Sequence, residues 1–241
     1  MSLFTEECRE HAESAWRAYR HHPWIEAMAD GTLTVEQFVA FQINDAPYIS
    51  DLHRCLALGM AKAPTGSEWS KAAATVLDDV WVLGEIEAKQ ELLRDFGYHD
   101  PLPIGPQAYI PAREAYANHL VRAALEGDIG DIASALYPCA MFTKIIGDRF
   151  RGTTVPGPAA FGRWADIYVQ RAVHRMAEAH AAMMNECAAR TDQAGRDRMR
   201  LLYLRSIQHQ IDVFDAAYTF DHAWPGDETP ARSEVAVGGE R

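Results

Sequence analysis

The stretch that decides the fold is TVEQFVAFQINDAPYISDLHRCLALGMAK, residues 34–62. Its apolar side chains recur every three or four positions, which is the period of an α-helix with one buried face. Thr34 is followed three residues later by Gln37, and this capping box is typical of a helix N-terminus. The pattern stops at the sequence APTG, residues 63–66. Pro47 lies inside the predicted helix and removes one of its hydrogen bonds, so we expect a kink there.

Helical periodicity extends over most of the remaining chain, and no segment shows convincing strand alternation. We therefore predict an all-α fold, a bundle of about eight helices with the heme-oxygenase-like architecture discussed below. Residues 1–224 are expected to form one domain, and residues 225–241, rich in Gly, Glu and Ser, a disordered tail. Besides a short helix opened by Pro23, the expected helices lie near residues 3–20, 34–62, 67–96, 111–126, 128–150, 159–170, 172–190 and 193–222.

The composition of the chain excludes several classes of binding partner. The chain has 241 residues, of which 48% are hydrophobic, enough for a core that needs no disulfide or metal. Its net charge of −11 argues against a nucleic-acid partner and against an anionic membrane surface. We find no signal peptide and no apolar run of about 18 residues, the length of a membrane span. We expect a cytoplasmic protein without a membrane partner.

The four cysteines, Cys8, Cys55, Cys139 and Cys187, are widely spaced and form no C-x-x-C pair. Such spacing is wrong for a zinc site or a redox pair, so we expect reduced thiols.

The first motif of chemical interest is Asn44-Asp45-Ala46-Pro47-Tyr48. Asp45 borders the apolar face of the predicted helix, where a carboxylate without a partner costs several kcal/mol. Tyr48 is three residues on and therefore stands on the same face. The pair fits two interpretations, a structural Asp–Tyr contact at the kink or a ligand-binding pair.

The second motif is Leu136-Tyr137-Pro138-Cys139-Ala140-Met141-Phe142. Pro138 again falls within a predicted helix, and Cys139 follows it in apolar surroundings. A buried cysteine is usually an inert small hydrophobe. A kink just before it can instead direct the thiol into a cavity between helices.

Taken together and in order, these motifs resemble the TenA family, also called thiaminase II or aminopyrimidine aminohydrolase, over about residues 4–224. The resemblance implies an all-α, heme-oxygenase-like fold and a homo-oligomer, a dimer or tetramer. It also implies a hydrolase that converts an aminomethyl-pyrimidine from thiamin breakdown to the hydroxymethyl form, and in many members cleaves thiamin itself. The expected partner is therefore a small aminopyrimidine or related heteroaromatic compound, with no cofactor and no metal.

The resemblance also implies roles for particular residues. Cys139, after Pro138, matches the nucleophile, and Asp45 matches the residue that hydrogen-bonds the amino edge of the pyrimidine. The aromatic residues that it implies for the substrate pocket are Tyr48, Tyr116, Tyr168 and Phe142.

Gln210 is the most important departure, because the family carries a glutamate there that bonds a ring nitrogen and supplies a proton. A glutamine donates a hydrogen bond but cannot transfer a proton. No acid replaces it on the same helix face, whose neighbours are Ser206, Ile207, Val213 and Phe214. We therefore expect weak hydrolysis or a different substrate.

Two alternatives remain beside the hydrolase. One is a pyrimidine-binding or regulatory protein that has lost the proton donor, which Gln210 favours. The other is a heme-oxygenase-like oxidase, such as a PqqC-like or di-iron enzyme. Di-iron bundles need Glu-x-x-His pairs, whereas Glu85 and Glu87 have no histidine three residues on.

Overall fold

The computed structural model describes residues 2–105, 108–168 and 171–227, and over these residues the chain is helical without strands, which confirms the all-α prediction. The predicted tail lies outside the described residues from position 228 on. The helices are α1 Phe4–His11, α2 Glu13–Arg20, α3 Pro23–Asp30, α4 Val35–Asp45, α5 Tyr48–Lys62, α6 Glu68–Leu77, α7 Asp79–Arg94, α8 Pro111–Glu126, α9 Ile129–Phe150, α10 Ala159–Ile167, α11 Arg171–Ala188 and α12 Gln193–Thr219.

Some predicted helices are divided in two. The helix expected over 34–62 forms α4 and α5, with the break at Ala46 and Pro47. Both residues keep right-handed helical angles (Pro47 has φ −61° and ψ −31°), so the chain bends there without reversing. The helices expected over 3–20 and 67–96 are also divided, at Ala12 and at Asp78, and these two residues leave the helical angles (φ −99° and ψ 13° at Ala12, φ −60° and ψ 133° at Asp78).

The local signals at helix starts act as expected. The capping box of α4 is present, because Thr34 Oγ1 accepts from the Gln37 backbone N–H at 3.2 Å and Gln37 Oε1 accepts from that of Thr34 at 3.1 Å. Asp128 caps α9 by accepting from the N–H groups of Gly130 and Asp131. These contacts satisfy donors that a helix N-terminus otherwise leaves free.

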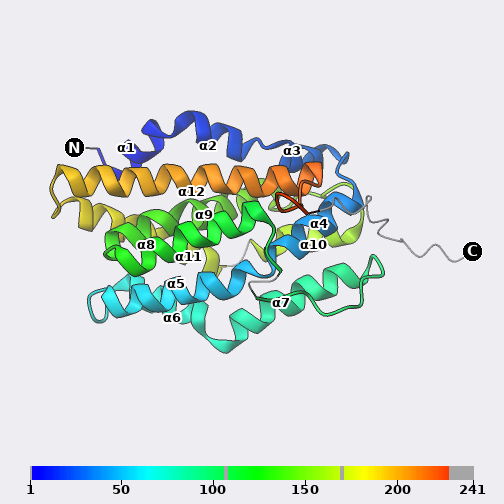
Figure 1. Ribbon diagram of the computed structural model, residues 1–241, viewed down its shortest axis with the longest axis horizontal. Helices are drawn as coiled ribbons and strands as arrows, with labels where there is room; N and C mark the ends of the chain where they lie inside the picture. Colours follow the sequence, from blue (N-terminus) through cyan, green and yellow to red (C-terminus); the bar gives the residue numbers. More distant parts are fainter. Residues whose placement is uncertain (1, 106–107, 169–170, 228–241) are drawn as a thin grey trace, which may run out of the picture.

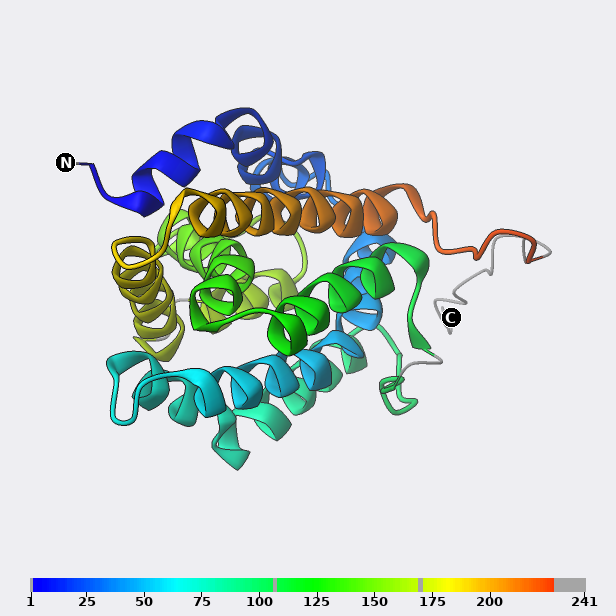
Figure 2. The same cartoon turned by 60° about the vertical axis from the view of Figure 1, so that its left-hand side comes forward.

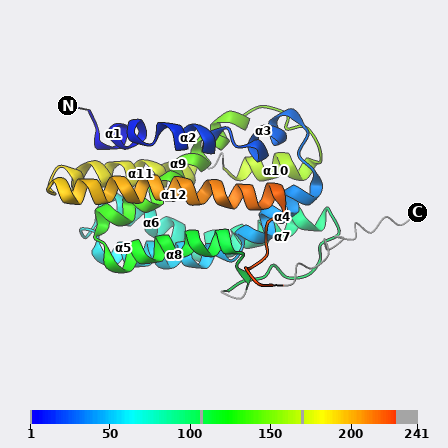
Figure 3. The same cartoon turned by 45° about the horizontal axis from the view of Figure 1, so that its top comes forward.

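Helix α9 lies inside the bundle and carries the second motif. It packs against α5, α8, α10, α11 and α12 and continues through Pro138. By length and composition alone α9 could cross a membrane, contrary to the sequence expectation, but 61% of its most apolar window is buried inside the protein. α12 runs the length of the molecule, with α1–α3 on one side and α5–α7 on the other (Figures 1, 2 and 3).

An aromatic cluster fixes one end of the bundle. Trp24 of α3 lies 4.9 Å from Phe41 of α4 and 5.3 Å from Trp164 of α10, measured between ring centroids. Phe41 stacks on Phe214 of α12 at 4.8 Å. All four rings are buried, and each contributes roughly 1.5–3 kcal/mol to stability. The cluster holds α4, α10 and α12 together around the cavity described next.

Candidate functional site

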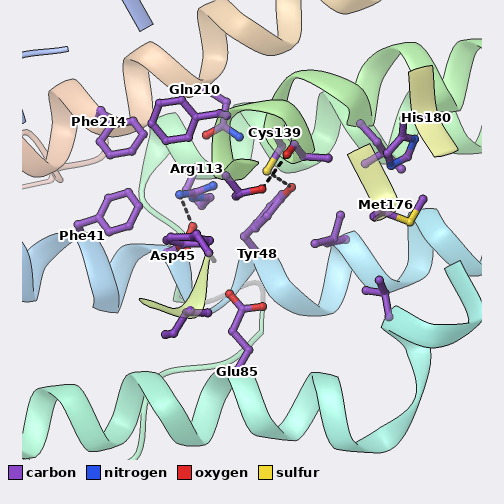
Figure 4. Close-up of a pocket in the computed structure, with 18 of the residues that line it drawn as sticks. Phe41, Asp45, Tyr48, Glu85, Arg113, Cys139, Met176, His180, Gln210 and Phe214 are labelled. Carbon is purple, nitrogen blue, oxygen red and sulfur yellow. Dashed lines mark hydrogen bonds and ion pairs between the residues drawn. The ribbon is translucent and has the colours of Figure 1, made fainter. Parts of the chain in front are cut away.

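A cavity of about 130 Å³ lies between α4, α5, α7, α9, α10 and α12 (Figure 4). Phe41, Trp164 and Phe214 form part of its wall, so a ligand in the cavity would contact the aromatic cluster. An apolar cavity with a few convergent polar groups is the usual form of a small-molecule site. Its polar groups include Asp45, Tyr48, Glu85, Arg113, Cys139 and Gln210.

The structure brings most of the residues singled out from the sequence to this cavity. They come from four segments far apart in the chain and are Asp45, Tyr48, Cys139, Phe142, Tyr168 and Gln210.

Tyr116 lies differently, because it is fully buried behind Tyr48, on which it stacks at 5.3 Å. Gln210 Nε2 donates to the Tyr116 hydroxyl at 3.1 Å. Tyr116 therefore supports two cavity residues from behind, where the resemblance implied a wall of the cavity itself.

Cys139 faces the cavity one residue after Pro138, and the Tyr48 hydroxyl donates to its Sγ at 3.7 Å (Figure 4). Burial raises the pKa of the thiol to about 11, the Tyr48 hydrogen bond lowers it, and the charges of Asp45 and Glu85 raise it further. The positive charge of the Arg113 guanidinium lowers the pKa of Cys139. At neutral pH the group is therefore a thiol, which must lose its proton as it reacts.

Asp45 is held by two buried cations and not by Tyr48. Arg113 Nη2 lies 2.6 Å from Asp45 Oδ1, and Lys89 Nζ lies 2.8 Å from Oδ2. Both cations are 1% exposed. Burial alone would raise the pKa of the Asp45 carboxyl, but Lys89 and Arg113 together hold it below its usual value. Asp45 is thus ionised and keeps only the lone pairs that the cations leave free.

Glu85 enters the cavity from α7, on the wall across from Cys139 and Gln210 (Figure 4). Its side chain is 17% exposed, and Oε1 lies 4.0 Å from the same Lys89 that holds Asp45. Burial raises the pKa of Glu85, and the charge of Asp45 adds to this, whereas Lys89 opposes it. The pKa of Asp45 is therefore lowered and that of Glu85 is raised, because Asp45 has two close cations and Glu85 shares one of them at longer range.

Sequence reasoning missed Glu85, Lys89 and Arg113 as site residues. Glu85 and Lys89 are four residues apart, a spacing that usually indicates an exposed ion pair. Arg113 stands in the first turn of α8, where the helix dipole disfavours a cation. This unfavourable position was the one feature of the sequence that could have indicated a special role for Arg113. Its guanidinium lies 4.8 Å from the centre of the Tyr48 ring, and its buried Nε has no hydrogen-bond partner.

The other end of the cavity is apolar. Met176 and His180 lie at this end (Figure 4), and the apolar side chains of Leu52, Leu56 and Val76 also line the cavity. Trp69 Nε1 donates to His180 Nδ1 at 3.0 Å, and burial lowers the pKa of His180 to about 3. His180 is therefore neutral, and this end suits an uncharged part of a ligand.

Within the described part of the chain, no three His, Cys, Asp or Glu side chains lie close enough to share a metal ion. The positive charge that a metal would bring to Asp45 and Glu85 comes here from Lys89 and Arg113.

Comparison with known proteins assigns the fold and the family. The model of the TENA/THI-4/PQQC family matches residues 9–219. The chain is 25% identical to the aminopyrimidine aminohydrolase of Bacillus subtilis, over 89% of each chain. It is also 25% identical to the protein of that name from Halalkalibacterium halodurans, over 87% of this chain and 92% of the other. A TenA homologue from P. horikoshii has the same fold, with a TM-score of 0.74 at 20% identity, over 90% of this chain and 99% of that one. Since the family model spans nearly the whole helical region, this chain belongs to the TENA/THI-4/PQQC family.

Proposed function

We propose that this protein is a hydrolase that breaks an exocyclic C–N bond of an aminopyrimidine, with Cys139 as the nucleophile. The observation that carries the proposal is the position of the Cys139 thiol in an aromatic cavity beside Asp45 and Tyr48. Two relatives named aminopyrimidine aminohydrolase match along nearly their whole length. A flat heteroaromatic ring fits between the aromatic walls, with its amino edge toward the free lone pairs of Asp45.

The cavity supports covalent catalysis in four balanced steps. The Cys139 sulfur forms a bond to a ring carbon, and the thiol proton passes to a ring nitrogen. The ring electrons then expel the exocyclic nitrogen, which takes up a proton as the C–N bond breaks and leaves as ammonia. Water adds to the exocyclic carbon and gives up a proton, which balances the one taken up by the ammonia, and the C–S bond breaks as the ring proton returns to sulfur. The net reaction exchanges an amine for a hydroxyl group.

Tyr48 contributes to the first step by hydrogen-bonding the sulfur. Because the pKa of Cys139 is raised to about 11, a free thiolate is rare, and proton transfer must accompany the attack. Gln210 can orient the ring through its amide but cannot carry the proton. We therefore propose slow hydrolysis of aminomethyl-pyrimidine and thiamin, or a diverged heteroaromatic substrate.

The test is incubation of the purified protein with aminomethyl-pyrimidine and with thiamin, following hydroxymethyl-pyrimidine by chromatography. Calorimetry with hydroxymethyl-pyrimidine measures binding separately. Cys139→Ser should abolish turnover and keep binding. Turnover that survives in Cys139→Ser would exclude the cysteine mechanism.

Gln210 favours a second candidate, a pyrimidine-binding or regulatory protein without turnover. It predicts tight binding of hydroxymethyl-pyrimidine and no product from either compound, even after Gln210→Glu. The hydrolase proposal predicts that this substitution increases turnover.

We also propose that the protein acts in the cytoplasm as a dimer or tetramer. Leu125 of α8 and Leu201 of α12 are 61% and 52% exposed, and a contact between copies would cover such apolar side chains. Light scattering on the purified protein measures the state, and a monomer would contradict the proposal.

A further inference from the structure

The reaction proposed above needs a second proton transfer that Gln210 and Cys139 do not provide. When the C–N bond breaks, the electron pair goes to the exocyclic nitrogen, and an amine leaves well only if it gains a proton. The water that replaces it must lose one. A single carboxyl group can perform both transfers, first as an acid and then as a base.

Most titratable groups of the cavity are unsuited to this task. Asp45 is ionised and held by Lys89 and Arg113. His180 is neutral and accepts from Trp69 at the apolar end. Burial raises the pKa values of Tyr19, Tyr48 and Tyr168 well above 10, so none of these phenols can give up its proton and recover it near neutral pH.

Glu85 differs from these groups in position and in its contacts. Figure 4 shows its carboxyl directed into the cavity from the wall across from Cys139. Among the described contacts its partner is the Lys89 ammonium at 4.0 Å, beyond the range of a direct hydrogen bond. A group so placed has both oxygens available to a ligand.

The orientation that Asp45 imposes brings the leaving group toward Glu85. In an aminomethyl-pyrimidine of this class, the ring amino group and the aminomethyl group stand on adjacent ring atoms. A ring with its amino edge at Asp45 therefore holds its aminomethyl group close to the neighbours of Asp45. Glu85 is such a neighbour, because the same Lys89 Nζ lies 2.8 Å from Asp45 Oδ2 and 4.0 Å from Glu85 Oε1.

We propose that Glu85 is the catalytic acid and base for the leaving amine, an inference that rests on the proposed hydrolase function. The Glu85 carboxylic acid gives its proton to the exocyclic nitrogen as the C–N bond breaks, and ammonia leaves. The resulting carboxylate takes a proton from the water that adds to the exocyclic carbon, which restores the acid.

The protonation of Glu85 is set by charges on several helices. Burial raises its pKa, the Lys89 ammonium lowers it and the Asp45 carboxylate raises it. α6, which also packs on α7, contributes only the apolar Val76 to the cavity. The titratable or charged groups that share the cavity or the cluster with Glu85 are Lys89 on α7, Tyr19 on α2, Asp45 on α4, Tyr48 on α5, Arg113 on α8, Cys139 on α9, Tyr168 after α10 and His180 on α11.

Two substrates separate this role from a structural one. The leaving nitrogen of aminomethyl-pyrimidine must gain a proton. The leaving nitrogen of thiamin belongs to a thiazolium ring, which becomes a neutral thiazole when the bond breaks and needs no proton. Both reactions use the carboxylate as the base for water, but only the first also uses the acid, so loss of the carboxyl group should slow the first reaction far more than the second.

The experiment compares Glu85→Gln with Glu87→Gln, a matched control at an exposed position two residues along α7. Both are made in the natural chain and in the Gln210→Glu background, where turnover is expected to be higher. Glu85→Gln should lower kcat on aminomethyl-pyrimidine by about 100-fold, within the range for general acid catalysis. KM should change by less than about threefold, and the thiamin rate should fall at least about tenfold less than the aminomethyl-pyrimidine rate in both backgrounds, because it loses only the base step. Glu87→Gln should change neither rate.

The pH profile gives a second readout. The aminomethyl-pyrimidine rate should fall as the pH rises through the raised pKa of Glu85, and this limb should be absent in Glu85→Gln and from the thiamin profile. Equal losses on both substrates, or a limb that persists in Glu85→Gln, would overturn the role of Glu85 and leave the hydrolase intact. No turnover of either substrate in either background would overturn the hydrolase, and the role of Glu85 with it.

Discussion

Asp45→Asn tests whether the two buried cations depend on the carboxylate between them. The substitution nearly preserves shape but removes the negative charge. Arg113 and Lys89, each 1% exposed, would then have lost their closest counter-charge. Breaking a buried ion pair by removing one partner costs about 3–5 kcal/mol. Asparagine can still accept one hydrogen bond, and Gln42 still accepts from Lys89 at 3.1 Å, so we expect the lower end, about 3 kcal/mol.

For a protein of this size each kcal/mol lowers the melting temperature by roughly 2–4 °C, so Asp45→Asn should lower it by about 6–12 °C. Thermal denaturation followed by circular dichroism measures this. Glu36→Gln, at an exposed acid of the same helix, is the control and should shift the melting temperature by little. In Asp45→Asn combined with Lys89→Met, part of the loss should be recovered, because one uncompensated cation is gone.

The pH dependence has a definite sign. The folded-state pKa of Asp45 lies below its unfolded value, so its contribution to stability is present above the unfolded pKa of about 4. That contribution is lost as the pH falls through the folded pKa. The difference between the natural protein and Asp45→Asn should therefore be largest near neutral pH and shrink in acid.

Ligand binding separates the two roles of Asp45. If it also bonds the amino edge of the pyrimidine, affinity for hydroxymethyl-pyrimidine should fall by about 1.5–3 kcal/mol, the range for a charged hydrogen bond. An unchanged melting temperature would refute the argument from buried charge. Unchanged affinity together with a large stability loss would make Asp45 a structural residue only.

Three further outcomes follow from the cavity. Iodoacetamide should label the partly exposed Cys139 and Cys187 before the buried cysteines, and the labelling rates should rise with pH toward about 11. Bound pyrimidine should protect Cys139 alone. Protection of Cys187 as well, or of neither cysteine, would contradict this prediction. Tyr48→Phe removes the donor to the sulfur and should raise the pKa of Cys139 further, seen as slower labelling at a given pH. Gln210→Glu should increase hydrolysis of aminomethyl-pyrimidine by about tenfold or more, most strongly in acid, and Cys139→Ser should abolish the gain; no gain with an intact cavity would indicate a different substrate or binding alone.

The helices could be derived from the sequence because their signals are local. The apolar period of residues 34–62 and the capping pair Thr34 and Gln37 depend on neighbours within one or two turns. The same is true of Pro111 at the start of α8. What local signals could not decide was whether a helix continues past a break. α9 continues through Pro138, whereas α4 ends before Pro47, since surrounding packing determines which interruption is tolerated.

In the candidate site, too, some residues could be identified from local sequence and others only from the tertiary structure. Asp45 and Cys139 were visible in the sequence because each is a polar or reactive group beside a proline in an apolar helix. The sequence could not show that Asp45 pairs with two cations, because Lys89 and Arg113 are 44 and 68 residues away in the chain. Glu85 looked like an ordinary helix-surface acid four residues before a lysine. Only the packing of α7 against α4 buries that pair, raises the pKa of Glu85 and turns its carboxyl toward the cavity.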